Sequence, residues 1–271
     1  MLELQSVDFG YKAQNKAIRD VSLVIRPGEF LAVAGRNGSG KTTLTKLLMA
    51  LKKPVSGKIL FEGKSIHQCT PADMARHIGY VFQNPDRQIF RNTVSAEVSY
   101  GPEQLGYAPH QIESYVREAL SVTGLSGLAG AYPSTLSRGQ KQRLAIASAL
   151  SMQPGIIILD EPTSGQDAQE RRLLLDLLGQ LHAQGKTIVL ITHDMDILAA
   201  YAQRVIVMAQ GSKVFDGTTN ELFRDTRLSQ WGLSQPAALT ISQSLAPFDI
   251  APSFTVSQLI HQLAPRLRRD E

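Results

Sequence analysis

The feature that most constrains this chain is a glycine-rich stretch at residues 35–42, which reads Gly-Arg-Asn-Gly-Ser-Gly-Lys-Thr. It fits the pattern G-x-x-x-x-G-K-[ST], in which glycines let the backbone wrap a phosphate group. The apolar run at 30–34 before it predicts a buried strand, and the apolar spacing at 43–49 predicts a helix. This order sets the unpaired N–H groups of the helix N-terminus against the phosphate. The sequence therefore predicts a nucleoside triphosphate site.

Two residues of this stretch carry specific chemistry. Lys41 supplies a positive charge to the β- and γ-phosphates, and the Thr42 hydroxyl can ligate Mg²⁺. A chance match in a turn is the alternative, but chance matches rarely bring both flanking elements. The residues assigned here to nucleotide binding are Gly35, Arg36, Asn37, Gly38, Ser39, Gly40, Lys41, Thr42 and Thr43.

Two adjacent carboxylates follow a second apolar run. Residues 156–159 are Ile-Ile-Ile-Leu, and Asp160 and Glu161 come directly after them. Ligands of parallel α/β sheets bind beyond the carboxyl ends of the strands, where the glycine loop also lies. We therefore expect Asp160 to hold Mg²⁺ opposite Thr42, and Glu161 to accept a proton from an attacking water. Without the glycine loop, such a pair would indicate only surface acids.

The rest of the chain alternates strand and helix patterns. Apolar runs predict strands at 58–61, 78–82, 187–191 and 205–208. Helical patterns occupy 93–124, 137–150 and 168–184, and the first of them is expected to break near 101–102 and again near 106–109. Short buried strands alternating with helices indicate a mostly parallel sheet covered on both faces. Broken period-two spacing at 2–25 indicates strands with one covered face.

The expected fold class is α/β, with an N-terminal antiparallel β part, a mostly parallel sheet, a helical insertion and a small C-terminal helical appendix. We place the main domain at 1–217, with the insertion at about 90–150, and the appendix at 218–271. The appendix ends in a basic run at 266–269, which we expect to be a solvated tail.

Composition restricts where such a chain works. With 43% hydrophobic and 19% charged residues it has the balance of a globular protein, and no apolar stretch approaches the roughly 18 residues that span a bilayer. Its beginning lacks the basic and apolar regions of a signal peptide. The net charge of +4 suits a membrane surface or nucleic acid and is specific for neither. Because Cys69 is the single cysteine, no intrachain disulfide can form, and we expect a cytosolic chain that reaches a membrane only through partners.

The stretch Leu136-Ser137-Arg138-Gly139-Gln140 is informative because of its order relative to the other motifs. It lies between the glycine loop and the carboxylate pair, and Ser164-Gly165-Gln166-Asp167 and His193 follow. With these motifs the chain resembles the nucleotide-binding subunit of an ATP-binding cassette (ABC) transporter. The resemblance covers residues 1 to about 217. It implies the P-loop ABC cassette fold, with ATP and Mg²⁺ as ligands.

The resemblance also implies roles for single residues. Tyr11 matches the aromatic that stacks on adenine, which is the reason to prefer ATP, and Gln83 matches the glutamine that reaches Mg²⁺ and the attacking water. Ser137, Gly139 and Gln140 match the signature that covers the γ-phosphate of ATP held by the opposite subunit. Asp167 belongs to the loop that communicates across the dimer, and His193 matches the histidine that contacts the γ-phosphate. The implied catalytic residues are Lys41, Glu161 and His193, and the implied metal ligands are Thr42, Gln83 and Asp160.

Two positions depart from the family pattern. Arg138 stands where the signature usually has a glycine, and Gln166 stands where the dimer loop usually has an apolar residue. Arginine tolerates the left-handed backbone region poorly, so we expect Arg138 to be helical or extended, with its charge near phosphate or in solvent. Neither position alters the expected general base.

Residues 83–88 read Gln-Asn-Pro-Asp-Arg-Gln, which is similar to the ATPases of energy-coupling factor (ECF) transporters. Tyr132-Pro133 before the signature and the helical appendix agree with that subgroup. The resemblance implies a peripheral subunit at the cytoplasmic face of a prokaryotic membrane, powering import of a metal ion or vitamin. Its implied partners are a second ABC ATPase subunit (the same or a sister chain), an integral membrane coupling subunit and a substrate-binding membrane subunit, with no nucleic acid.

Three alternatives compete with this interpretation. The chain could serve a different ABC transporter, or it could be a soluble ABC ATPase of DNA repair or translation. Repair forms carry a long coiled coil between Gln83 and Ser137, and translation forms carry a second cassette; neither feature is in this sequence. A regulator that does not hydrolyse nucleotide would lack Glu161 or His193, and both are present.

Overall fold

The structure is a computed structural model that describes residues 1–12 and 15–267. Its strands are β1 (Leu2–Lys12), β2 (Asn15–Ile25), β3 (Phe30–Ala34), β4 (Ser56–Phe61), β5 (Lys64–Ser65), β6 (Ile78–Val81), β7 (Ile156–Asp160), β8 (Thr187–Ile191), β9 (Arg204–Ala209) and β10 (Ser212–Thr218). Its α-helices are α1 (Lys41–Leu48), α2 (Pro71–Ala75), α3 (Val94–Gln104), α4 (Pro109–Val122), α5 (Arg138–Leu150), α6 (Ala168–Ala183), α7 (Met195–Tyr201), α8 (Thr219–Arg224), α9 (Ala237–Ser244) and α10 (Val256–Leu267).

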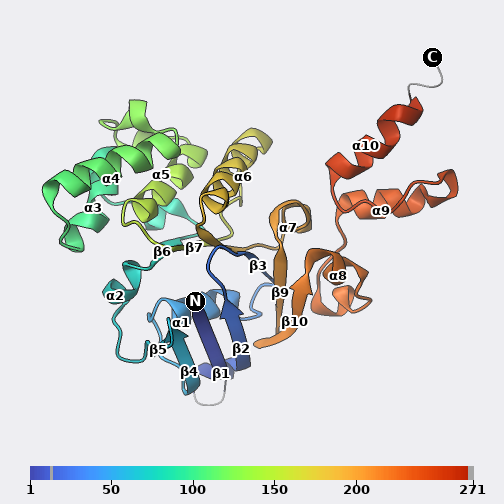
Figure 1. Ribbon diagram of the computed structural model, residues 1–271, viewed down its shortest axis with the longest axis horizontal. Coiled ribbons are helices and arrows are strands. Elements are labelled where there is room, and N and C mark those ends of the chain that lie inside the picture. The colour runs from blue at the N-terminus through green and yellow to red at the C-terminus, as the bar shows by residue number, and fades with distance from the viewer. Residues whose placement is uncertain (13–14, 268–271) are drawn as a thin grey trace.

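The strands form two sheets. The N-terminal sheet has the order β2-β1-β4-β5 and is antiparallel throughout. The larger sheet has the order β10-β9-β3-β8-β7-β6, in which all neighbours are parallel except β10 and β9. Both parts of the predicted α/β architecture, the antiparallel N-terminal sheet and the mostly parallel sheet, are therefore confirmed (Figure 1).

The central strands are buried on both faces. In β7, Ile156 and Ile158 join the apolar cluster formed with the N-terminal sheet and α1, while Ile157 and Leu159 join the cluster under α3–α6. Strand β8 divides its side chains between the same two clusters. A strand with apolar cover on both sides needs no polar alternation, which explains the unbroken Ile-Ile-Ile-Leu run.

Helices α3, α4, α5 and α6 gather beyond the β6–β7 side of the sheet (Figure 1). The predicted break near Gly101 and Pro102 is wrong, because α3 continues through both residues. A proline leaves the carbonyl four residues earlier without its helical donor, and here the Ser151 hydroxyl donates to that carbonyl, on Val98, at 2.7 Å. The second predicted break is correct, since α3 ends at Gln104 and α4 begins at Pro109.

The region after β10 is helical, as predicted, and consists of two parts. Leu222, Phe223 and Trp231 pack against the sheet together with Val205 and Val207, in a shared apolar cluster. Helices α9 and α10 follow with a smaller cluster of their own and project to one side of the molecule (Figure 1). The boundary at 217–218 stays a prediction, and Arg268 and Arg269 of the basic run at 266–269 lie outside the described residues.

Candidate functional site

The glycine loop leaves β3 at Ala34 and enters α1 at Lys41. Gly35, Gly38 and Gly40 have φ angles of 144°, 80° and 108°, a backbone region that L side chains rarely adopt. A side chain at Gly40 would also lie 2.8 Å from the Ala17 carbonyl oxygen. The loop therefore requires glycine at these positions, and the turn it makes aims the first N–H groups of α1 into the cavity.

The Lys41 side chain lies inside the curl of this loop. Its Nζ donates to the carbonyls of Gly35 at 2.6 Å and Arg36 at 3.0 Å, and only 7% of the residue is exposed. Burial lowers the pKa of Lys41, while the charges of Glu161 and Asp160 act in the opposite direction. The ammonium is thus held at the base of the cavity, with the loop backbone as its only hydrogen-bond acceptors among the described residues.

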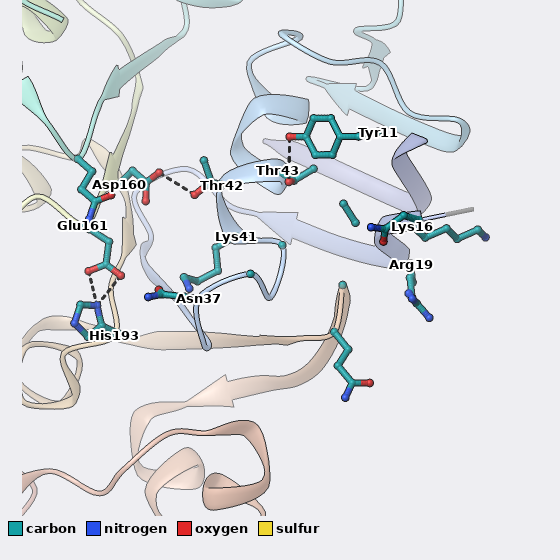
Figure 2. A pocket seen from close by; sticks show the side chains of 17 residues that line it. Tyr11, Lys16, Arg19, Asn37, Lys41, Thr42, Thr43, Asp160, Glu161 and His193 are labelled. Carbon is teal, nitrogen blue, oxygen red and sulfur yellow. Dashed lines mark hydrogen bonds and ion pairs between the residues drawn. The ribbon is translucent and has the colours of Figure 1, made fainter. Parts of the chain in front are cut away.

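Thr42 and Asp160 face each other across the cavity. The Thr42 hydroxyl donates to Oδ2 of Asp160 at 3.1 Å (Figure 2). The Tyr80 hydroxyl donates to the same oxygen at 3.1 Å. Burial and the Asp160 charge raise the pKa of Tyr80, so its hydroxyl stays protonated and remains a donor. A threonine hydroxyl paired with a carboxylate is the donor set that suits Mg²⁺ beside a nucleotide phosphate, and these residues fit that ion.

Glu161 and His193 form the second polar pair of the cavity. The Nδ1 atom of His193 lies 2.8 Å from Oε1 and 2.7 Å from Oε2 of Glu161. Glu161 has a φ of 48°, and its N–H donates to the Ile191 carbonyl at 2.9 Å, which anchors the residue to the end of β8. The Glu161 side chain is 9% exposed whereas that of His193 is 66% exposed. The carboxylate is therefore shielded and oriented by a histidine that stands on its solvent side.

These residues line one cavity of about 620 Å³. Figure 2 places Tyr11 at one end and the Glu161–His193 pair at the other, with Lys41 and Thr42 between them. The cavity is lined by Tyr11, Asn15, Lys16, Ala17, Arg19, Asn37, Gly38, Gly40, Lys41, Thr42, Thr43, Gln83, Asp160, Glu161, His193, Gln210 and Gly211. An elongated anion with a flat end would fit this arrangement, because cations and N–H groups lie at its middle and an aromatic ring at one end.

Tyr11 has a ring that is available to a ligand. The residue is 55% exposed, its hydroxyl lies 3.4 Å from that of Thr43, and the Lys52 Nζ lies 5.9 Å from the ring centroid. Phe9 supports the ring edge-on at 5.1 Å between centroids. An exposed ring that is fixed by its neighbours can serve as a stacking platform.

The loop residues that do not line the cavity support it from behind. Gly35 packs against the Met208 carbonyl, and the Arg36 carbonyl accepts the N–H of Ser39 at 3.1 Å. The Ser39 hydroxyl is buried and has no hydrogen-bond partner among the described residues. A buried hydroxyl that has no partner in the protein fits a loop that binds an anion.

The signature residues lie away from this cavity. The Ser137 hydroxyl accepts the Gln140 N–H at 3.1 Å and the Gln140 side-chain oxygen accepts the Ser137 N–H at 2.9 Å, so the two form a capping box on α5. Gly139 lies against Glu170, and Asp167 caps α6 by accepting the Glu170 N–H at 2.8 Å. Arg138 is the first helical residue of α5, as predicted. Within one chain, then, the predicted site residues fall into two separate groups.

Several residues that line the cavity or contact its lining escaped the sequence interpretation. Tyr80, whose hydroxyl holds Asp160, was expected only as part of a strand; its position on β6 beside β7 was the available signal. Lys16 and Arg19 add positive charge to the cavity from β2. Gly211 in the β9–β10 turn donates its N–H to the Ser39 carbonyl at 3.0 Å, a long-range contact with no local sequence signal.

Comparison with known proteins supports one family. Residues 18–164 match the ABC transporter family. The chain is 43% identical over 259 residues to an ABC transporter ATP-binding protein of Methanosarcina acetivorans, covering 94% of this chain and 42% of that protein. It is 34% identical over 275 residues to the energy-coupling factor transporter ATP-binding protein EcfA of Methanothermobacter thermautotrophicus, covering 100% of this chain and 88% of that protein.

A solved structure shares both fold and sequence. It is cbiO1 from Clostridium perfringens, described as part of the ABC transporter complex cbiONQ, with a TM-score of 0.77 and 35% identity over 84% of this chain and 92% of that one. The chain spans only about two fifths of the length of the first curated relatives that it matches. Among the described residues, no helix combines the length and apolar character that crossing a membrane requires.

Proposed function

This chain belongs to the ABC transporter family, and we propose that it is the ATP-hydrolysing subunit that powers a membrane importer of the energy-coupling factor type. The observation that carries the proposal is the meeting of three groups in one cavity. These are Lys41 in its glycine loop, the Thr42–Asp160 pair and the Glu161–His193 pair. A protein that bound nucleotide without hydrolysing it would not need the Glu161–His193 pair.

The proposed roles follow from the positions along the cavity. The Tyr11 ring stacks on the adenine, and the loop N–H groups and Lys41 bind the phosphates. Thr42, Asp160 and Gln83 are the residues that would hold Mg²⁺, which supplies positive charge to the β- and γ-phosphate oxygens when bound. Tyr80 keeps the Asp160 carboxylate pointed at Thr42.

Proton transfer is assigned to Glu161. Its carboxylate takes a proton from the water that attacks the γ-phosphorus, and the His193 ring orients the carboxylate through Nδ1. The exposed face of His193 is then directed at the γ-phosphate. Lys41 stabilises the negative charge that gathers on the phosphoryl oxygens as the bond to the β-phosphate breaks.

The signature makes this a shared site. Ser137, Gly139 and Gln140 do not line the cavity of their own chain, so the cap over the γ-phosphate must come from a second molecule. We propose a head-to-tail pair with two ATP molecules at the interface, formed with a second copy or a sister ATPase. ATP binding closes the pair and hydrolysis reopens it.

A second surface supports a membrane partner. A cavity of about 300 Å³ lies beside η1 (Pro85–Arg87) and is lined in part by Asp86, Phe90 and Tyr132. Phe90 is 60% and Tyr132 is 63% exposed, and large exposed apolar side chains grouped together mark interaction sites. We propose that an integral membrane coupling subunit docks here at the cytoplasmic face, next to a substrate-binding membrane subunit that selects a metal ion or a vitamin.

Two measurements test the proposal. If the cap comes from a second molecule, turnover per subunit should fall on dilution to concentrations at which sedimentation shows only monomer. Constant turnover across that range would refute the shared site.

For the membrane partner, tagged chain purified from native membranes should carry an integral membrane subunit, and the double variant Phe90→Ser/Tyr132→Ser should release it. Leu173→Ser, an exposed apolar position on α6, is the matched control; release by that control alone would count against the docking surface.

A further inference from the structure

The Arg138 side chain lies flat against the backbone of Gly165. A Cβ atom built on Gly165 would lie 2.7 Å from Cζ, 2.7 Å from Nη1 and 2.9 Å from Nη2 of Arg138. Three nearly equal distances mean that the face of the guanidinium, and not its edge, covers the glycine. A planar, weakly hydrated cation suits such stacking on a peptide. In residues 1–12 and 15–267, no carboxylate pairs with this guanidinium.

The contact joins one position that departs from the family pattern, Arg138, to the residue that precedes the other, Gln166. Arg138 opens the signature helix α5, and Gly165 precedes Gln166 in the loop that leads to α6. Gly165 has a φ of 70°, so glycine meets two needs there: a left-handed backbone and space for the guanidinium. A second contact between the same segments packs Gly139 against Glu170. The start of α5 and the 165–170 segment are therefore packed together.

The loop that receives Arg138 is short and internally bonded. The Ser164 N–H donates to the Glu161 carbonyl at 3.2 Å, and the Gln166 N–H donates to the Thr163 carbonyl at 3.2 Å. Thr163 is buried at 8% exposure. These two hydrogen bonds give Gly165 a continuous bonded connection to Glu161, four residues earlier.

We propose that Arg138 is a positioning residue that couples the two ATP sites of the pair, by linking the signature to the Glu161 of its own chain. The inference rests on the proposed function, in which this signature covers the ATP of the other subunit. Nucleotide in that neighbouring site presses on residues 137–140, and the Arg138–Gly165 stack passes the shift to the loop that carries Glu161. Each site then hydrolyses best when the other is filled.

The competing role for Arg138 is a direct contact with the neighbour's phosphate. The two roles differ in what they require of the side chain. A phosphate contact needs positive charge, which Lys retains, whereas stacking on Gly165 needs the guanidinium plane, which Lys lacks. Replacing Gly165 by Ala displaces the guanidinium from the other side and leaves its charge in place.

The experiment measures the ATP dependence of turnover for the full chain as the assembled pair. Wild type should show a Hill coefficient above 1, and Arg138→Ala, Arg138→Lys and Gly165→Ala should each bring it toward 1 with turnover reduced about 5- to 10-fold. Nucleotide affinity of diluted monomer should stay unchanged. The double variant Arg138→Ala/Gly165→Ala should lose no more than either single variant, because both remove one contact.

Two controls separate the contact from its side effects. Gly124→Ala places alanine at a φ of 68° with no neighbour within 4 Å, so it reports backbone strain alone. Arg117→Ala removes an exposed arginine from α4. Both should keep the wild-type Hill coefficient. Hydrogen exchange adds a readout without turnover: Arg138→Ala should speed exchange of the 163–167 amides, and Arg117→Ala should not.

The outcomes that overturn the inference are distinct from failure of the proposed function. If Arg138→Lys kept near-normal turnover and Hill coefficient, Arg138 would be assigned to a phosphate contact and the coupling role overturned. The same conclusion would follow if the losses of turnover in the two single variants multiplied in the double variant. A cooperative wild type that Arg138→Ala leaves unchanged would overturn it as well, with the proposed function intact. If the assembled wild type hydrolyses no ATP, the proposed function fails and the coupling fails with it.

Discussion

The imidazole of His193 reaches both carboxylate oxygens of Glu161 through a single atom, Nδ1, at 2.8 and 2.7 Å. The two residues come from neighbouring parts of the sheet, since Glu161 follows β7 and His193 follows β8. Glu161 is shielded and His193 is exposed, so the histidine both fixes the carboxylate and stands between it and solvent. This relationship supports the proposed role of Glu161 as the group that accepts a proton from water.

We expect Glu161→Gln to separate ATP binding from hydrolysis. The amide keeps the shape of the carboxylate but cannot take a proton, so turnover should fall by about 10²- to 10⁴-fold, the usual contribution of a general base. The nucleotide Kd should change by less than about threefold, because Lys41 and the loop are untouched. Phosphate release and titration with a fluorescent nucleotide measure the two quantities.

The control for this variant is Glu113→Gln. Glu113 is 74% exposed on α4 and pairs only with Arg117 among the described residues, so its loss should leave turnover at the wild-type level. Turnover of Glu161→Gln within tenfold of wild type would show that another group accepts the proton.

The metal requirement should depend on Asp160 and, more weakly, on Tyr80. Chelation of Mg²⁺ should abolish hydrolysis, and Asp160→Asn should raise the half-saturating Mg²⁺ concentration by more than 100-fold. Tyr80→Phe removes only the hydroxyl that holds Asp160 Oδ2 at 3.1 Å, so a shift of about tenfold is expected, as for other outer partners of metal ligands. Hydrolysis measured across a Mg²⁺ titration checks both values.

Tyr107→Phe is the matched control, because its hydroxyl also donates to an oxygen of the chain, the Met152 carbonyl, at 3.2 Å and does not line the cavity. An equal Mg²⁺ shift in Tyr80→Phe and Tyr107→Phe would mean that the Tyr80 hydroxyl has no specific effect on the metal site.

The helical region after β10 should influence nucleotide affinity through Gly232. The aliphatic part of the Arg36 side chain lies against Gly232, so an alanine there would displace it. The Arg36 carbonyl also accepts the Lys41 ammonium at 3.0 Å, and moving Arg36 disturbs the loop around that lysine. We expect Gly232→Ala to weaken ATP binding about 3- to 10-fold, which corresponds to roughly 1 kcal/mol.

Gly106→Ala controls for backbone strain in this test. Gly106 has a φ of 74° with no neighbour within 4 Å, against 69° at Gly232, so both alanines should destabilise the fold by about 1 kcal/mol. Isothermal titration should find altered affinity only in Gly232→Ala. Equal ATP affinities in the two variants would show that the position of the Arg36 side chain does not affect nucleotide binding.

The sequence predicted those parts of the site whose signals are local. The glycine loop and the carboxylates at the end of β7 lie where a strand gives way to a turn, and an apolar run in the sequence shows where such a strand ends. Contacts between distant segments were not predictable in this way. The stack of Arg138 on Gly165 and the hydrogen bond from Tyr80 to Asp160 depend on how helices and strands pack.

The wrong prediction at Gly101 and Pro102 has a similar physical cause. Local propensity disfavours both residues inside a helix, and this cost was outweighed by distant partners. The Ser151 hydroxyl satisfies the Val98 carbonyl, and Met152 fills the space beside Gly101 that a side chain would otherwise occupy. Ser151 and Met152 lie about fifty residues away in the sequence. The residues near α3 in the sequence therefore do not show that the helix continues through Gly101 and Pro102.

Acid should weaken the edge of the large sheet at Asp216. Burial acts to raise the pKa of this carboxyl, but hydrogen bonds from Arg204 and Lys213 outweigh it and hold the pKa below its usual value of 3.8. A carboxyl with a lowered pKa stabilises the fold above its unfolded-state pKa, and this stability is lost as the pH falls through the folded-state value. The contribution is therefore complete at pH 7 and declines below about pH 4.

Urea unfolding of wild type and Asp216→Asn at pH 7, 5 and 3 tests this sign. The variant should be less stable by about 1 kcal/mol at pH 7 and 5, a modest value because the ion pairs are partly exposed. The difference should shrink at pH 3, where the wild-type carboxyl begins to bind a proton. Asp176→Asn, whose partner Arg172 lies 3.8 Å away with both side chains exposed, should show no such dependence. A difference that grows toward low pH would mean that protonation of Asp216 stabilises the sheet, which is opposite to the effect of its ion pairs.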